Sequence, residues 1–247
     1  MEKQFANLVA IDSNWLNTPS AKDYIASLLH QNERRHFGLL ERPSLSPSKD
    51  IDIIKYKVFL CGKSGGGKTA TVANISGCGI PKTVNETGGI ETTIIYWPAR
   101  LLSTGKLVFF CLQFWDVGDH AVKKFDHILP SCVSNVDCIM LIFSLTDRSS
   151  FHEIPQLLNQ LPATDERPPV HIVVATKKDQ FIHSDVSENE MLKFSQLRNI
   201  PIFKMRNKTT LKGKEHIFEI SSFMNRLCDL LLQRDQKMAE SVTREVQ

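Results

Sequence analysis

The sequence predicts an α/β protein whose central sheet is mostly parallel, and three observations support this class. Short apolar runs rich in Val, Ile, Met and Phe alternate along the chain with amphipathic stretches of helical spacing. Two of these runs, 137–144 and 170–176, are apolar on both faces, as central parallel strands are. Two longer runs, 92–102 and 106–115, are joined by a short Ser-Thr-Gly turn. They predict a hairpin, and so one antiparallel strand.

The composition is that of an ordinary globular chain. Its 247 residues are 42% hydrophobic and 23% charged, which excludes disorder, collagen and a small disulfide scaffold as descriptions of the whole chain. A net charge of +3 favours neither nucleic acid nor acidic lipid as a partner. The six cysteines form no C-x-x-C pair, which fits buried, reduced thiols. Since we find no secretory signal and no apolar run near the ~20 residues that span a bilayer, we expect a soluble, cytoplasmic protein.

Residues 1–53 differ from the rest and are predicted to form an N-terminal extension. Thr18 and Pro19 are suited to cap and begin a helix, and apolar residues at helical spacing follow at 24–29. The Pro- and Ser-rich residues 42–50 indicate a linker. The helix either packs onto the main domain or docks onto another protein, and the two roles are compatible.

The main domain is expected over residues 54–235, as a six-stranded sheet with helices on both faces. The predicted strands are 54–61, 92–102, 106–115, 137–144, 170–176 and 200–205. The predicted helices are 68–76, 121–129, 149–161, 188–197 and 214–233. Residues 236–247 form a C-terminal tail, which we expect to be a solvated helix end.

The clearest motif is Gly62-Lys63-Ser64-Gly65-Gly66-Gly67-Lys68-Thr69, which matches the phosphate-binding pattern G-x-x-x-x-G-K-[ST] between a predicted strand and helix. Glycines let successive backbone N–H groups converge on phosphate oxygens, and the following helix adds its dipole. We expect Lys68 to contact the β and γ phosphates and the Thr69 hydroxyl to ligate Mg²⁺. The predicted phosphate-binding residues are Gly62, Ser64, Gly65, Gly66, Gly67, Lys68, Thr69 and Ala70.

A second motif indicates which base is bound. The strand 170–176 runs into Thr176-Lys177-Lys178-Asp179, and [N/T]-K-x-D after a strand is the guanine-recognition element of small GTPases. The Asp179 carboxylate would accept the ring N1–H and the exocyclic 2-amino group, a pair that adenine does not offer. The Lys177 stem would cover the face of the ring. We therefore expect guanine on Thr176, Lys177 and Asp179.

Asp116 closes the run that follows the hairpin turn, and it would hold Mg²⁺ through a water molecule, as the Walker B acid does. Together these motifs span residues 54–235, and the domain that they define resembles the Rab-like GTPases of the Ras superfamily. This resemblance implies a P-loop small-GTPase fold, GTP or GDP with Mg²⁺ as ligands, and loops that change shape with the bound nucleotide.

The resemblance also assigns residues in two loops. Residues 85–91 are similar to the switch I stretch of Rab proteins, which makes Thr87 the candidate for the second hydroxyl ligand of Mg²⁺. Residues 206–208 align best with the Ser-Ala-Lys element that contacts guanine in this family. Only the lysine survives there, so Asn207 and Lys208 are the candidates on that side of the base.

The residues after Asp116 depart from the family. Rab-like proteins read D-x-x-G-Q-E, whereas here Val117 is followed by Gly118, Asp119 and His120. Aligned without a gap, Asp119 replaces the glycine that meets the γ-phosphate and His120 replaces the water-orienting glutamine. With one residue deleted, Gly118 keeps the glycine's role and Asp119 replaces the glutamine. The glutamine is missing either way, so we expect slow or absent hydrolysis, with His120 as the alternative catalytic residue.

Three finer stretches are similar to the Rem- and Rab-like small GTPases of the ciliogenesis and planar cell polarity effector complex: 37–43, 114–118 and 123–127. This resemblance implies a GTP-dependent subunit that is recruited to basal bodies with the Fuzzy and Inturned proteins. It also implies roles in cilium assembly, basal-body cargo targeting, vesicle trafficking and exocytosis. Rab proteins carry prenyl groups on C-terminal cysteines, whereas no cysteine follows Cys228 here, so membrane association is expected only through partners.

Two other functions remain open from the sequence. One is a pseudo-GTPase, a constitutively GTP-loaded structural subunit that never cycles. The other is a P-loop kinase or ATPase, which would need an adenine site, and the Thr176–Asp179 motif argues against that site.

Overall fold

A computed structural model describes residues 10–22, 24, 51–77, 87–118, 128–161, 167–208, 211 and 213–245. The chain divides into two compact units. Unit 1 comprises Met1–Tyr56, Ile95–Leu112 and Lys212–Gln247, and unit 2 comprises Lys57–Ile94 and Gln113–Leu211.

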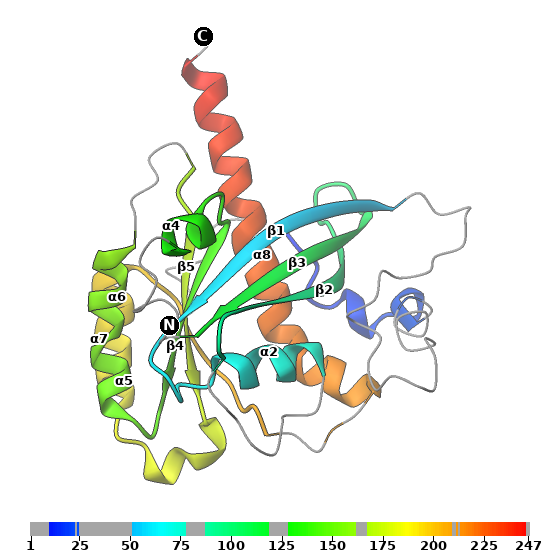
Figure 1. Ribbon diagram of the computed structural model, residues 1–247. Coiled ribbons are helices and arrows are strands. Elements are labelled where there is room, and N and C mark those ends of the chain that lie inside the picture. Colours follow the sequence, from blue (N-terminus) through cyan, green and yellow to red (C-terminus); the bar gives the residue numbers. More distant parts are fainter. Residues whose placement is uncertain are drawn as a thin grey trace. The chain divides into compact units, whose positions relative to one another are not determined.

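Six strands form one sheet in the order β2-β3-β1-β4-β5-β6 (Figure 1). The pairs β1–β4, β4–β5 and β5–β6 are parallel. A tight turn joins β2 to β3, and within it the Leu101 amide donates to the Lys106 carbonyl at 2.9 Å, so this pair is an antiparallel hairpin. The prediction of an α/β fold with a mostly parallel six-stranded sheet is confirmed. The strands are β1 (Asp52–Cys61), β2 (Ile90–Arg100), β3 (Leu107–Val117), β4 (Cys138–Ser144), β5 (Val170–Thr176) and β6 (Ile202–Lys204).

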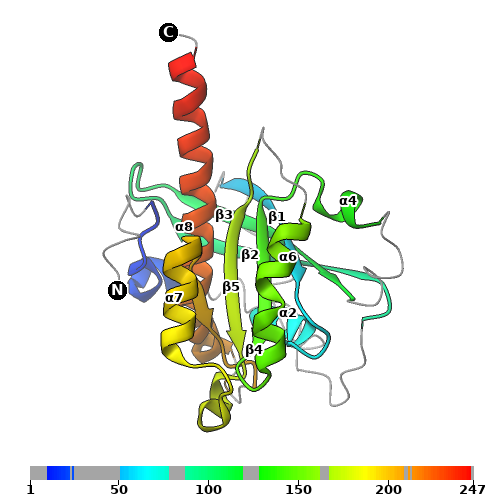
Figure 2. The same ribbon diagram turned by 90° about the vertical axis from the view of Figure 1, so that its left-hand side faces the viewer.

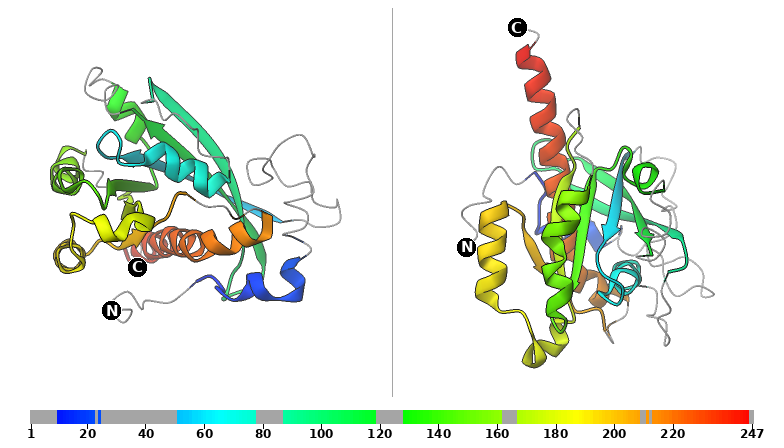
Figure 3. Two further views of the ribbon diagram at one scale, coloured as in Figure 1. Left: turned by 90° about the horizontal axis from the view of Figure 1, so that it is seen from below. Right: turned by 60° about the vertical axis from the view of Figure 1, so that its left-hand side comes forward.

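Unit 2 buries its core around the central strand β4, all seven residues of which are buried. Figure 2 shows α6 and α7 in front of β4 and β5, and the left view of Figure 3 shows α2 on the other side of these strands. Ile139 and Phe143 of β4 belong to a buried apolar cluster with Ile154 of α6 and Met191 of α7. The helices of unit 2 are α2 (Lys68–Ser76), α4 (Ile128–Val133), α5 (Arg148–His152), α6 (Ile154–Gln160), η3 (Lys178–His183) and α7 (Glu188–Arg198).

In unit 2, one helix differs from its prediction and another is described only in part. The helix expected over 149–161 is divided into α5 and α6 at Glu153. Pro155, in the first turn of α6, has no N–H to bond to the preceding turn, so α5 does not continue through it. The helix expected over 121–129 lies mostly outside the described residues, and its last two residues begin α4.

Unit 1 is built around the long helix α8 (Gly213–Glu245), which continues without a break through the predicted domain end at 235. Residues near the N-terminus pack onto it. The Ala10 amide donates to the Asp229 carboxylate of α8 at 2.7 Å, and Ile11 forms an antiparallel bridge with Leu101 beside the hairpin turn. Trp15, in the short 3₁₀ helix η2 (Trp15–Asn17), is 1% exposed.

The predicted start of the N-terminal helix agrees with the structure, since residues 19–22 and 24 are helical. The rest of that predicted helix and the predicted linker at 42–50 lie outside the described residues. Among the helices that the structure describes, none combines the length and the apolar character that a membrane span requires.

Candidate functional site

The loop of residues 62–67, which we call the phosphate loop, connects β1 to α2 in unit 2 and requires glycine at its first position. Gly62 has a φ of +149°, and a Cβ atom there would lie 2.1 Å from the carbonyl oxygen of Ile142 in β4. The close approach of β4 therefore excludes any side chain at this position. The other predicted phosphate residues, Ser64, Gly65, Gly66, Gly67 and Ala70, follow in the same loop and in the first turn of α2.

Lys68 places a buried ammonium group inside this loop. The residue is 7% exposed, and its Nζ donates to the Gly62 carbonyl at 2.6 Å and lies 3.4 Å from the Lys63 carbonyl. In the described part of the chain, both hydrogen-bond acceptors of this ammonium group are backbone carbonyls. A buried cation that is held only by carbonyl dipoles is suited to receive an anion.

Three oxygen-bearing side chains meet beside this loop. The Thr69 hydroxyl of α2 donates to Asp116 Oδ2 at the end of β3, at 2.5 Å. The Thr87 Oγ1, from just before β2, lies 3.1 Å from Thr69 Oγ1 and 3.5 Å from Asp116 Oδ2. We call this set the oxygen triad. The structure thus brings together the three predicted Mg²⁺ residues, which are far apart in the sequence.

The oxygen triad fits a hard divalent cation. Asp116 is 3% exposed, and its second carboxylate oxygen, Oδ1, is buried with no hydrogen-bond partner in the part of the chain that the structure describes. Such an orphaned acceptor is costly without a ligand. Hydroxyl and carboxylate oxygens are the protein ligands that Mg²⁺ prefers. Within the described ranges there is no cluster of three or more His, Cys, Asp or Glu side chains that could hold a metal.

Gly118 lies directly against the Thr87 loop. Its amide donates to the Gly89 carbonyl at 3.0 Å, and a Cβ atom on it would lie 1.9 Å from the Thr87 carbonyl oxygen. In this structure the amide is therefore engaged by Gly89, and its predicted contact with a phosphate stays a prediction. Asp119 and His120, the other residues of this segment, lie outside the described residues.

On the base side, Thr176 is fully buried and faces the phosphate loop. Its Oγ1 lies 2.7 Å from the Gly66 carbonyl and 3.1 Å from the Phe143 carbonyl. Lys177 adopts a left-handed conformation and places its Nζ 3.4 Å from Thr146 Oγ1, while Asp179 is exposed. Thr176 thus ties the phosphate loop to the end of β5, and the predicted contacts of Thr176, Lys177 and Asp179 with a base stay predictions.

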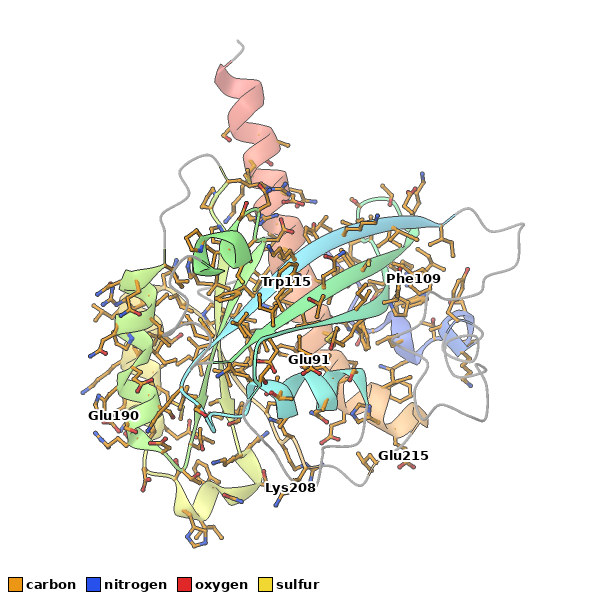
Figure 4. The ribbon with its side chains drawn as sticks, viewed as in Figure 1. Glu91, Phe109, Trp115, Glu190, Lys208 and Glu215 are labelled. Atoms are coloured by element: carbon orange, nitrogen blue, oxygen red, sulfur yellow. The ribbon has the colours of Figure 1, made fainter. Side chains whose placement is uncertain are left out.

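The third predicted base element is held by α2. The Asn207 side-chain amide donates to Thr71 Oγ1 at 3.0 Å, and the Asn74 amide donates to the Arg206 carbonyl at 3.2 Å. Lys208, which is labelled in Figure 4, is exposed. Nothing in the sequence pattern singled out Thr71 or Asn74, because both sit within an ordinary helix.

The fold and the site define a P-loop protein of the small-GTPase type. The chain belongs to the Ras family, whose model matches residues 57–226. It is 40% identical over 237 residues to "Ciliogenesis and planar polarity effector 2" of Xenopus laevis, which covers 93% of this chain and 95% of that protein. It is 41% identical over 234 residues to the Mus musculus protein of the same name, with 92% and 90% covered.

A more distant relative is "GTP-binding protein REM 2" of Rattus norvegicus. It is 27% identical over 129 residues, which is 52% of this chain and 36% of that protein. The match to the Ras family model and to the relatives above confirms the Ras-superfamily membership that the motifs predicted.

Proposed function

We propose that this protein is a GTP-binding molecular switch that acts through partner proteins in cilium assembly. GTP and GDP would bind to the loop of residues 62–70, with Lys68 on the phosphates and Asp179 on the guanine. The observation that carries the proposal is the oxygen triad with its orphaned Asp116 oxygen, placed beside the buried Lys68 ammonium. Bound Mg²⁺ would neutralise charge on the β and γ phosphates and would be held by Thr69, Thr87 and, through water, Asp116.

The contact between Thr87 and Gly118 supports the switch. Thr87 lies three residues before the start of β2 and Gly118 immediately follows β3, so the two loops lie at the same end of one hairpin. Their close packing means that a displacement of Thr87 has to be accommodated at Gly118. Nucleotide-dependent movement of one loop would therefore reach the other directly.

The proposed hydrolysis is slow, because the chain lacks the water-orienting glutamine after Asp116. A second candidate is the constitutively GTP-loaded structural subunit, which the missing glutamine also supports, since GTP that is never hydrolysed would stay bound. The double variant Asp119→Gly, His120→Gln separates the two. Faster GTP hydrolysis than wild type supports a slow switch, and an unchanged rate supports the structural subunit.

The ciliary part of the proposal is supported by the relatives named "Ciliogenesis and planar polarity effector 2", which match this chain over nearly their full length. We propose partners of the Fuzzy and Inturned type, a location at the basal body in the cytoskeleton, and roles in cargo targeting, vesicle trafficking and exocytosis. Membranes would be reached only through those partners. A pull-down that recovers such partners equally with the GDP-loaded and GTP-loaded protein would contradict a switch.

The biochemical test is titration calorimetry of nucleotide-free protein with GDP and GTP, with and without Mg²⁺. Lys68→Ala is expected to weaken binding by about 100-fold or more, because it removes charge-assisted bonds to two phosphates. Asp179→Ala is expected to abolish the preference for guanine over adenine nucleotides. Lys106→Ala, which removes an exposed lysine in the hairpin turn, is the control and should bind as wild type does. Full affinity in the Lys68 variant would rule out the assignment.

A further inference from the structure

Lys63 lies within the phosphate loop at a position where the motif sets no residue type. Its Nζ is 3.1 Å from Asp147 Oδ2 and also hydrogen-bonds to the Ser149 hydroxyl. Both partners lie where β4 passes into α5, a stretch that we call the 146–149 segment. An ion pair therefore connects the phosphate loop to a segment far away in the sequence.

The Asp147 carboxylate is fixed by its own surroundings. Its Oδ1 accepts from the Ser149 hydroxyl at 2.6 Å and from the Ser150 amide at 3.3 Å, which caps α5. These bonds, with Lys63, hold the pKa of Asp147 below its usual range. Asp147 thus presents an ionised, oriented acceptor to Lys63.

The same segment also contacts the base side. Lys177, of the guanine-recognition motif, places its Nζ 3.4 Å from Thr146 Oγ1. The 146–149 segment therefore contacts the phosphate loop through Asp147, and it contacts Lys177 of the guanine-recognition motif through Thr146. It is suited to keep the two loops at a fixed separation.

We propose that the Lys63–Asp147 pair is a clasp that holds the phosphate loop closed and slows release of the bound nucleotide. Lys63 and Asp147 are positioning residues, and the inference rests on the proposed function. The two side chains are 34% and 36% exposed, so the clasp is screened by salt and modest in strength. We expect its loss to speed release by about 2- to 10-fold.

The test uses the full chain loaded with fluorescent mant-GDP, and it measures the rate at which excess GDP displaces the label. Lys63→Ala and Asp147→Asn are expected to release about 2- to 10-fold faster than wild type at low salt, and all three rates should converge near 1 M salt. The asparagine keeps an oxygen to cap α5. The double variant should release no faster than either single variant, because both remove one interaction. Lys63→Arg keeps the positive charge, so its release rate should stay within about 2-fold of the wild-type rate.

The matched control is Arg148→Ala. Arg148 belongs to the same 146–149 segment, but its guanidinium pairs with Glu190 of α7 and bonds to the Asp185 carbonyl. The Arg148 and Glu190 side chains are 51% and 34% exposed, and in the described part of the chain Arg148 has no hydrogen bond or ion pair with the phosphate loop, so release should be unchanged. Slower release from Asp147→Asn would mean that Lys63, once freed, binds phosphate directly, and it would overturn the clasp. Equal rates for all loaded proteins would do the same. Failure of the wild type to take up mant-GDP would overturn the proposed function itself, and the clasp with it.

Discussion

At the scale of single residues, Gly118 has to be glycine because of a neighbouring loop, and not because of its own backbone conformation. A Cβ atom there would lie 1.9 Å from the Thr87 carbonyl oxygen, so glycine is required by the neighbouring loop. Gly88, one residue from Thr87, has nothing within 4 Å of the corresponding position. The two glycines therefore differ in what they tolerate, although they lie in adjoining loops.

Gly118→Ala is expected to lower the free energy of unfolding by about 1–3 kcal/mol, because the added methyl displaces a backbone carbonyl. It should also weaken Mg²⁺-dependent nucleotide binding, since Thr87 belongs to the oxygen triad. Gly88→Ala is the control and should stay within about 0.5 kcal/mol of wild type. Urea unfolding followed by circular dichroism measures the stability of both variants, and titration calorimetry with GDP and Mg²⁺ measures their nucleotide binding. Equal losses in the two variants would contradict the steric argument.

At the scale of secondary-structure elements, α7 begins with a capping box. The Ser187 hydroxyl accepts from the Glu190 amide at 3.2 Å, and the Glu190 carboxylate accepts from the Ser187 amide at 3.0 Å. Glu190, which is labelled in Figure 4, also pairs with Arg148. The backbone hydrogen bond from Ser187, followed by the Ser187 hydroxyl, lowers the pKa of Glu190 to about 2. The sequence pattern Ser-x-x-Glu is typical of such a box.

This cap makes a pH-dependent contribution to stability. Because the pKa of Glu190 is lower in the folded chain than its ordinary value of 4.5, the contribution is full above pH 4.5 and is lost as the pH falls through about 2. We expect the difference in unfolding free energy between wild type and Glu190→Gln to be constant above pH 5 and to shrink toward pH 2. Urea unfolding of both proteins across this range measures it. A difference that does not change with pH would contradict the assignment.

At the scale of the whole molecule, unit 1 gathers three stretches that are distant in the sequence. The N-terminal residues 10–22 contribute Trp15 and the Ala10 amide, which bonds to Asp229 of α8. From β2, the Trp97 indole donates to Asn225 of α8 at 2.8 Å. From β3 comes the buried Phe109, which is labelled in Figure 4. The N-terminal residues that the structure describes thus form part of a core.

Trp15→Ala is expected to lower the unfolding free energy by about 3–5 kcal/mol, because the indole is almost completely buried. Hydrogen exchange should rise in peptides from 95–112 and from α8, the other parts of unit 1. Leu102→Ala removes a side chain that is 54% exposed in the same unit, and it should change stability by less than about 0.5 kcal/mol. Unchanged exchange in the Trp15 variant would show that residues 10–22 are dispensable for unit 1.

The sequence by itself determined the element types, the phosphate loop and the family, because periodicity and motif spacing are local properties that one stretch of chain carries alone. The contacts of several site residues could not be predicted in this way, because their partners lie far away in the sequence. Thr176 was predicted at the guanine, which stays a prediction, and the structure adds a contact that no motif indicated: its hydroxyl donates to the Gly66 carbonyl, because β5 ends next to the phosphate loop. The predicted roles of the site residues toward phosphate, metal and base, including those of Asn207, Lys208 and His120, remain predictions.

Only the tertiary structure decided which side chains meet. Thr69 and Asp116 are 47 positions apart, Lys63 and Asp147 are 84 apart, and Ala10 and Asp229 are 219 apart. Each of these contacts depends on how strands and helices pack, since packing sets the distance between elements and a local pattern does not. The motifs of the chain therefore predicted a nucleotide site. The packing of strands and helices determined the oxygen triad, the Lys63–Asp147 ion pair and, in unit 1, the contacts of the N-terminal residues.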